Sequence, residues 1–398
     1  MHRTRVLVAG AAAVALALTA CTTDTPTENA PAGEQEQEQP SSDEWFVQAN
    51  YDKQLAQRDA TPEGPADQPW LQAIEPELVD TAQYKQDGKT LCFSNASISN
   101  PWRVTGWITM QQQVDVLKQA GEIGEFRSSD AGDDDNQQIS DIQAFVDAGD
   151  CNAIIISPSN TKTLTSAVKT ACESGVPVIV FDRGVETDCM VTFIHPIGGY
   201  AYGADAAEFL VEKLEPGSKV LALRILPGVD VLEHRWAAAQ QIFGDSELEI
   251  LGDEFTEGDG AKIKDIVTQY LQRGDVDGIW MDAGDGAVAA IEAFEDAGKD
   301  YPVMAGEDEL SFMRKWKDTG MTAIAPVYSN FQWRTPILAA VKIWKGEQVP
   351  SEWVLPQVPI TDADRDDYLE RNKDMPSLHY AKFGGEDLPG FPNAWKDR

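Results

Sequence analysis

Residues 176–185 read VPVIVFDRGV: a proline opens a short apolar run that ends in an aspartate and an arginine. The run 178–181 predicts a buried strand. Asp182 and Arg183 follow where that strand ends. Buried charges are costly without partners, and in open α/β sheets ligands bind at the carboxyl ends of the strands. The stretch therefore predicts a parallel sheet with a polar site at its carboxyl edge.

From Lys89 onward, short β-branched runs alternate with amphipathic stretches, a pattern typical of parallel sheets flanked by helices. A first set of predicted strands covers 90–95, 123–128, 153–157, 178–181 and 191–194. A second set covers 220–226, 248–255, 278–281, 303–305 and 322–327. Two such sets predict an α/β chain with two doubly wound domains. The length of 398 residues agrees, because domains usually have roughly 100–200 residues.

The chain is strongly acidic, with 66 acidic against 32 basic residues and a formal net charge of −34. Proteins that bind nucleic acid need a basic face, so we expect no nucleic-acid partner.

The N-terminus has the features of an export signal. Arg3 and Arg5 precede an apolar run over 6–18, which is too short to span a membrane and is typical of a secretory signal peptide, here 1–20. Leu18-Thr19-Ala20-Cys21 resembles a bacterial lipobox. That resemblance implies a lipidated Cys21 that anchors the mature chain to the outer face of the bacterial cytoplasmic membrane. An ordinary signal peptide with a chance cysteine is the alternative.

Two segments separate this signal from the predicted sheets. Residues 21–44 are rich in Thr, Pro, Glu and Gln and predict a disordered tether. Residues 45–88 are richer in aromatic residues but interrupted by prolines, and predict a short N-terminal extension.

Between Lys89 and Gln348, a series of landmarks resembles the ribose-binding type of bacterial solute-binding protein, periplasmic binding protein type 1. The landmarks are Asn100-Pro101-Trp102, 130–141, 153–158, 178–184 and Gly306-Glu307-Asp308. The resemblance implies two Rossmann-like lobes joined by a three-crossover hinge and closing on a ligand. It assigns 89–197 plus 328–345 to lobe 1 and 198–327 plus 346–360 to lobe 2. Residues 361–398 remain as a C-terminal extension.

The resemblance also assigns ligand contacts in the first lobe. Asp182 offers acceptors and Arg183 offers a fork of donors, which suits neighbouring hydroxyl groups; a structural ion pair is the alternative. Trp102 would stack on the apolar face of a sugar ring. Asn100 would offer its amide, although Asn-Pro is also an ordinary turn opening.

In the second lobe, Arg235 and Asp308 match ligand-binding positions of the family, with solvated surface charges as the alternative. Asp282 follows the strand 278–281, where the match is offset. Asn330, Gln332 and Trp333 lie at the last crossover, in a stretch that departs from the family pattern. These departures favour a ligand other than ribose.

The resemblance implies an extracytoplasmic, monomeric solute-binding lipoprotein that captures a sugar, polyol or related small polar ligand and delivers it to an ABC importer permease. A surface sensor that presents its ligand-bound form to a signalling receptor is the alternative. A gene regulator of the same fold would carry a DNA-binding helix-turn-helix where this chain has its signal and acidic tether.

We expect no enzyme activity, no cofactor and no metal site. The first predicted strand leads into a stretch without GxGxxG, and GxxxxGK[ST] and GxSxG motifs are absent. Residues 133–135 are three aspartates that suit the start of a helix better than a calcium site.

Four cysteines follow Cys21, an even number that suits an oxidising compartment and allows three pairings. Cys172 and Cys189 are both predicted at the lower edge of the sheet, so we favour their pairing. Cys92 and Cys151 would then pair or stay free, and Cys151 with Cys172 is a competitor.

Overall fold

The structure is a computed structural model that describes residues 45–396. The predicted signal peptide, the tether and Cys21 lie outside the described residues.

Lobe 1 is built on a six-stranded sheet in which all neighbouring strands are parallel, in the order β13-β6-β5-β4-β2-β3. Its strands are β2 (Thr90–Asn95), β3 (Glu125–Asp130), β4 (Ala153–Ser157), β5 (Val178–Phe181), β6 (Thr192–Pro196) and β13 (Glu352–Leu355). One face packs against α2 (Pro101–Gln119) and α10 (Thr335–Lys345). The other packs against α3 (Asp135–Ala148) and α4 (Thr161–Glu173).

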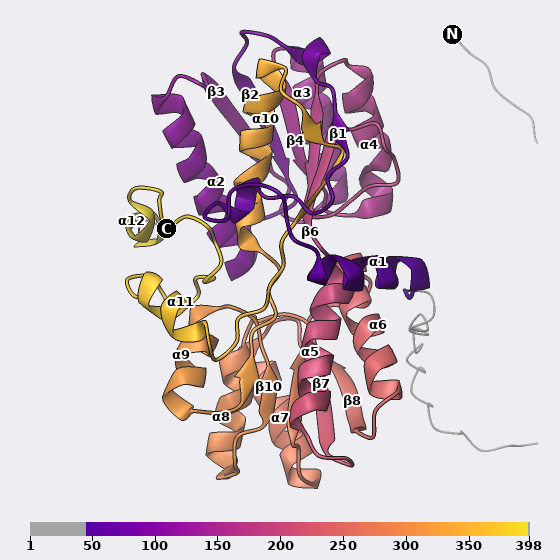
Figure 1. Cartoon of the computed structure of the whole chain (residues 1–398), viewed down its shortest axis with the longest axis vertical. Coiled ribbons are helices and arrows are strands. Elements are labelled where there is room, and N and C mark those ends of the chain that lie inside the picture. The colour runs from indigo at the N-terminus through magenta and orange to yellow at the C-terminus, as the bar shows by residue number, and fades with distance from the viewer. Residues whose placement is uncertain (1–44, 397–398) are drawn as a thin grey trace, which may run out of the picture. The chain divides into compact units, whose positions relative to one another are not determined.

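Lobe 2 repeats this arrangement around a five-stranded parallel sheet in the order β11-β10-β9-β7-β8. Its strands are β7 (Lys219–Arg224), β8 (Glu249–Phe255), β9 (Gly278–Met281), β10 (Val303–Ala305) and β11 (Ala323–Ile324). The helices α5 (Gly199–Lys213) and α6 (Asp230–Gly244) cover one face. The helices α7 (Gly260–Arg273), α8 (Ala287–Ala297) and α9 (Leu310–Thr319) cover the other, as Figure 1 shows. The predicted doubly wound α/β fold is confirmed.

All ten predicted strands form, and five have the predicted bounds. The reason is composition: β4 and β5 are continuous apolar runs whose residues are all buried, as expected for central strands of a parallel sheet. The predicted strand 322–327 is shorter, because only Ala323 and Ile324 pair with β10. The charged start of α3 is also confirmed, since the Asp134 side chain caps it by accepting from the Gln137 amide.

Three connections join the lobes: the first follows β6, the second runs from β11 to α10, and the third follows β13. The second contains a short 3-10 helix, η4 (Asn330–Trp333). In the third, Ile360 returns to lobe 2 and pairs with Ala325. Residues 346–360 were expected in lobe 2, but β13 within them pairs with β6 of lobe 1, where Trp353 and Leu355 join the apolar core. The prediction is therefore wrong for the part of this segment that forms β13, which belongs to lobe 1.

The N-terminal extension contacts both lobes. Its helix α1 (Gln48–Asp59) packs on α5, where Arg58 pairs with Asp205 at 2.7 Å. The chain then reaches lobe 1, through η2 (Pro69–Leu71), β1 (Leu78–Val79) and η3 (Ala82–Tyr84). There β1 pairs antiparallel with β12 (Val349–Pro350).

The C-terminal extension also contacts both lobes. Its first helix, α11 (Arg365–Arg371), packs on α9 of lobe 2, and its last, α12 (Phe391–Lys396), packs on α2 of lobe 1. Figure 1 shows the two helices in yellow beside different lobes.

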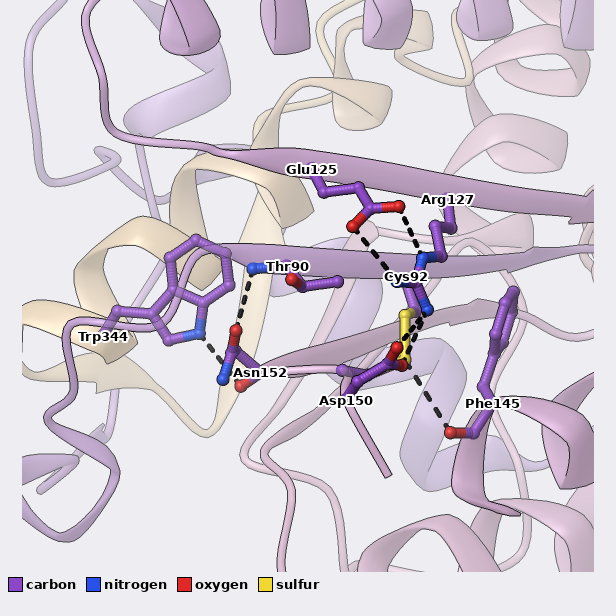
Figure 2. The surroundings of a disulfide bond; sticks show 9 residues. Thr90, Cys92, Glu125, Arg127, Phe145, Asp150, Asn152 and Trp344 are labelled. Carbon is purple, nitrogen blue, oxygen red and sulfur yellow. Dashed lines mark hydrogen bonds and ion pairs between the residues drawn. A yellow bond between two sulfur atoms is a disulfide. The ribbon is translucent and has the colours of Figure 1, made fainter. Parts of the chain in front are cut away.

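Two disulfides stabilise lobe 1: Cys92 pairs with Cys151, and Cys172 with Cys189. Cys172–Cys189 is the pairing that the sequence favoured, and Cys92 and Cys151, which the sequence left paired or free, are paired. Figure 2 shows the surroundings of Cys92, where Arg127 lies between Glu125 and Asp150 with ion pairs of 2.7 Å to each. Within residues 45–396, every helix is too short or too polar to cross a membrane.

Candidate ligand-binding site between the lobes

A cavity of about 110 Å³ lies between the lobes at the carboxyl edges of both sheets. Lobe 1 lines it with Asn100, Trp102, Arg103, Asp182 and Arg183. Lobe 2 lines it with Ile225, Leu226, Val229, Val231, Leu232, Arg235, Ala283, Asp285 and Glu307, and Tyr328 and Tyr380 complete it. Asp182, Ile225, Ala283 and Glu307 each lie one or two residues beyond a strand end. This is the position where open α/β sheets bind ligands.

Asp182 is buried and pairs with Arg103 on α2, with 3.1 Å between Oδ2 and Nη2. Its backbone has a φ of +71°, an unusual conformation that aspartate adopts more readily than most residues. The Tyr328 hydroxyl donates to its carbonyl oxygen at 3.3 Å. The neighbouring Arg183 turns elsewhere, because its guanidinium donates to the Ser159 carbonyl. The ion pair at the end of β5 thus joins residues on different elements.

The start of α2 holds two predicted site residues. Asn100 is the N-cap of the helix, and its Oδ1 accepts from the Arg103 amide at 2.9 Å. Trp102 lines the cavity, but its indole Nε1 donates to the Tyr328 carbonyl at 3.0 Å. The ring of Trp102 therefore remains for apolar contact with a ligand, whereas its polar edge is already paired.

Arg235, on α6, lies between two aromatic rings. Its guanidinium carbon is 3.9 Å from the ring centre of Tyr202 and 5.0 Å from that of Tyr328. Nη1 donates to the Asp282 carbonyl and lies 3.9 Å from Oε1 of Glu307. Stacking and cation–π attraction favour arginine in such a position.

The acidic side of the cavity is formed by Glu307 and Asp285. Burial raises the pKa of Glu307 to about 8, although Arg235 opposes the shift. Oε2 of Glu307 accepts from the Gly284 amide at 2.8 Å. Burial also raises the pKa of Asp285 to about 6. Glu307 is therefore mostly protonated at neutral pH and can donate a hydrogen bond to a ligand.

Two buried donors of the cavity residues have no hydrogen-bond partner within residues 45–396: Nη1 of Arg103 and Nε of Arg235. A buried donor without a partner costs about 1–3 kcal/mol, so each favours a ligand oxygen or a water molecule. They come from opposite lobes.

Five of the predicted site residues line this cavity: Asn100, Trp102, Asp182, Arg183 and Arg235. The other five lie outside its lining. The Asp282 carboxylate accepts from the Ile225 amide at 2.9 Å, and the Asp308 carboxylate from the Lys382 amide at 2.6 Å. In this structure both aspartates shape the backbone around the cavity.

The remaining three predicted site residues, Asn330, Gln332 and Trp333, lie in the second crossover. Asn330 donates to the Trp102 carbonyl at 2.7 Å and so holds the start of α2. Trp333 is fully buried, with its ring centre 5.1 Å from that of Phe181. Gln332 is also fully buried. Asn330 and Trp333 thus join the crossover to lobe 1.

Among the polar residues of the cavity, sequence reasoning assigned no ligand contact to four: Arg103, Glu307, Tyr328 and Tyr380. Position could have indicated two of them, because Arg103 follows Trp102 and Glu307 precedes Asp308 in the landmark 306–308. Tyr380 gave no signal, since it belongs to the extension beyond the family core. Within the described residues, no cluster of three His, Cys, Asp or Glu side chains is arranged to hold a metal ion.

Two α/β lobes with a cavity at the carboxyl edges of both sheets define a two-lobed periplasmic binding protein. Residues 91–348 match the family described as periplasmic binding protein domain, and the chain belongs to this family. The resemblance to ribose-binding proteins of type 1 is thereby confirmed.

Curated relatives include the ribose import binding protein of Bacillus subtilis, 25% identical over 65% of this chain and 83% of the relative. The Escherichia coli protein of the same name is 22% identical over 66% of this chain and 88% of the relative. Among solved structures, an ABC transporter solute-binding protein from Thermobispora bispora has a TM-score of 0.64 at 21% identity, covering 78% of this chain and 96% of the other. A solute-binding protein from Bacillus halodurans, solved with myo-inositol, has a TM-score of 0.63 at 21% identity, covering 71% and 98%.

Proposed function

We propose that this protein captures a sugar or a related small polar ligand, such as a polyol, between its lobes and delivers it to the permease of an ABC importer. The arrangement of charge in the cavity carries the proposal. Arg103, Arg183 and Arg235 line the cavity together with Asp182, Asp285, Glu307 and apolar side chains. Because this set offers both donors and acceptors with little net charge, it suits a neutral ligand with several hydroxyl groups better than an anion.

Ligand binding would hold the lobes together. Arg103 and Asp182 line the cavity from lobe 1, and Arg235 and Asp285 line it from lobe 2, so a ligand contacts both groups only when the lobes are close. A permease can then distinguish the loaded, closed form from the empty one. The relatives named for ribose import, and the fold shared with the inositol-bound protein, support this proposal.

We infer that the protein works outside the cytoplasm as a monomer, held to the outer face of the cytoplasmic membrane by a lipid on Cys21. The apolar run and the lipobox-like LTAC support this inference. Its relatives are binding proteins, and we accordingly propose that the ligand leaves the cavity chemically unchanged.

A sensor role is the second candidate. One protein of similar fold is the fructose-binding periplasmic domain of a hybrid two-component system, with a TM-score of 0.62 at 17% identity. A sensor would present the same closed lobes to a receptor rather than to a permease. Capture of partners with the ligand-loaded chain separates the two roles, because only one of them predicts a permease among the captured proteins.

Thermal unfolding of the full chain against a panel of sugars, polyols and amino compounds tests the binding proposal. A specific ligand at 100 times its Kd stabilises the fold by about 2.7 kcal/mol, which raises the Tm by several degrees. Recovery of the ligand after binding shows whether it is unchanged. Asp182→Ala should abolish the shift. Absence of any shift across the panel, or consumption of the ligand, would contradict the proposal.

A further inference from the structure

A segment of the C-terminal extension, residues 377–382, forms part of the cavity wall. It runs beside the chain that follows β10 of lobe 2. The Leu310 amide donates to the His379 carbonyl at 2.8 Å, and the Ala381 amide to the Asp308 carbonyl at 2.9 Å. Between these bonds, Tyr380 forms an antiparallel bridge with Glu309. The segment is therefore fixed by its backbone and not only by side-chain contact.

The residues that directly follow this segment, 383–387, are held from lobe 1. Arg334, just before α10, donates to the Gly384 carbonyl and pairs with Asp387 at 2.6 Å. Phe383 packs in a small apolar cluster with Ile108 of α2 and Phe391 of α12. Contacts on both lobes and behind the segment restrict its movement, so the side chain that it places in the cavity has a defined position.

That side chain is Tyr380, which is fully buried and lines the cavity. Its hydroxyl lies 3.4 Å from Oδ1 of Asp285, a long hydrogen bond. A tyrosine hydroxyl donates one hydrogen bond and also accepts, so while it donates to Asp285 it can still accept from a ligand hydroxyl. Tyr380 lies outside residues 91–348, the part that matches the family.

The cavity is small, so the ring of Tyr380 affects the size of ligand that fits. The free volume of about 110 Å³ is well below the range of about 300–1,000 Å³ of pockets for drug-sized ligands. An aromatic ring that fills one wall of so small a cavity determines how large a ligand can enter.

We propose that Tyr380 is a specificity-determining residue, whose ring restricts the site to single small polyols or monosaccharides without bulky substituents and whose hydroxyl, together with Asp285, binds a ligand hydroxyl. This inference rests on the proposed function. It assigns to the C-terminal extension a part in ligand selection, besides its contacts with both lobes.

Isothermal titration of the full chain tests it, with tetritols, pentoses, hexoses, their methyl glycosides and disaccharides as titrants. Tyr380→Phe keeps the ring and removes the hydroxyl; one lost neutral hydrogen bond should weaken binding of the best ligand about fivefold. Tyr380→Leu enlarges the cavity. The ratio of its affinity for a larger or substituted sugar to its affinity for the best wild-type ligand should therefore be at least tenfold higher than in the unchanged chain. Tyr368→Phe is the matched control, because Tyr368 lies in the same extension but lines a different pocket.

The outcomes separate the two proposals. If the unchanged chain binds no compound, the proposed function fails and this inference fails with it. If the unchanged chain binds a ligand, but Tyr380→Phe and Tyr380→Leu keep its affinities and size preference within twofold, the proposed function stands and the role of Tyr380 is overturned. Melting without ligand verifies that each variant is folded. Should Tyr380→Leu fail to fold, the loss of affinity in Tyr380→Phe, compared with Tyr368→Phe, decides the question.

Discussion

Arg103 and Asp182 form a buried ion pair that joins the first turn of α2 to the end of β5, with 3.1 Å between Nη2 and Oδ2. Both side chains are at most 5% exposed. The pair also explains why a buried strand can end in a charged residue, because the partner of Asp182 comes from another element.

Removing one member of this pair should destabilise the protein strongly. A buried charge left without its partner costs about 3–5 kcal/mol, whereas replacing both members is much less costly. We therefore expect Asp182→Ala and Arg103→Met each to lower the free energy of unfolding by about 3 kcal/mol or more. The double variant should lose less than the sum. Urea denaturation of the four proteins measures the coupling, and strictly additive losses would contradict a direct pair.

The sequence predicted the position of Asp182 but not its partner, for a physical reason. Arg183 is adjacent in sequence, but its guanidinium donates to the Ser159 carbonyl instead. The observed partner, Arg103, is 79 residues away. Strands β4 and β5 were predictable because their apolar runs are continuous; pairing across elements depends on how the helices pack, which local composition does not encode.

The predicted site residues also fall into two groups, those that line the cavity and those that bind backbone groups, and local sequence does not distinguish them. Asp182 and Arg235 line the cavity, whereas Asp282 and Asp308 are turned toward backbone amides. A strand-end aspartate can face the ligand or cap its own turn, and both choices have the same sequence pattern. Tyr380 could not be predicted at all, because it depends on the path of the C-terminal extension.

Arg235→Lys should weaken ligand binding more than it weakens the fold. Lysine keeps the charge near Glu307 but lacks the planar group that stacks on Tyr202 at 3.9 Å. It also lacks the Nε donor that has no partner within the described residues. We expect at least a tenfold loss of affinity with a change in the free energy of unfolding of about 1 kcal/mol or less. Titration and urea denaturation of the same preparation test this. Arg273→Lys, at an exposed position on α7, is the control; equal affinities for all three proteins would contradict the assigned role.

The two disulfides should contribute unequally to stability. They close loops with sequence separations of 59 and 17 residues, for Cys92–Cys151 and Cys172–Cys189. Loop-closure entropy then predicts losses of about 4 and about 3 kcal/mol when each pair is replaced by alanine. Cys189 is exposed whereas Cys92 is fully buried, so mild reductant should open Cys172–Cys189 first. Denaturation of the two alanine variants measures which disulfide contributes more to stability. Thiol labelling followed by mass mapping measures which disulfide is reduced first, and labelling of Cys92 before Cys189 would contradict the predicted order of reduction.

The stability of the protein should depend on the protonation of Glu307. Burial raises its pKa from 4.5 to about 8 in the folded state. Between these values the folded chain binds more protons at this group than the unfolded chain does. The contribution of Glu307 is therefore complete below about pH 4.5 and is lost as the pH rises toward 8, at up to about 1.4 kcal/mol per pH unit.

Glu307→Gln isolates this effect, because glutamine keeps the shape and the acceptor for the Gly284 amide but does not titrate. Other groups contribute as well. Burial raises the pKa of Glu309 to about 8 and that of Asp282 to about 7, which acts in the same direction. Burial lowers the pKa of His379 to about 3, so its contribution grows as the pH rises to 6.5. These groups are common to both proteins, so their difference reports Glu307 alone. From pH 5.5 to 7.5, the free energy of unfolding of the unchanged chain should fall more steeply with pH than that of Glu307→Gln. Glu295→Gln is the control, since an ion pair with Lys315 lowers the pKa of Glu295 and it titrates below this range. Parallel curves for the unchanged chain and Glu307→Gln would mean that Glu307 is ionised in the folded protein, and that the cavity presents a carboxylate rather than a hydrogen-bond donor to its ligand.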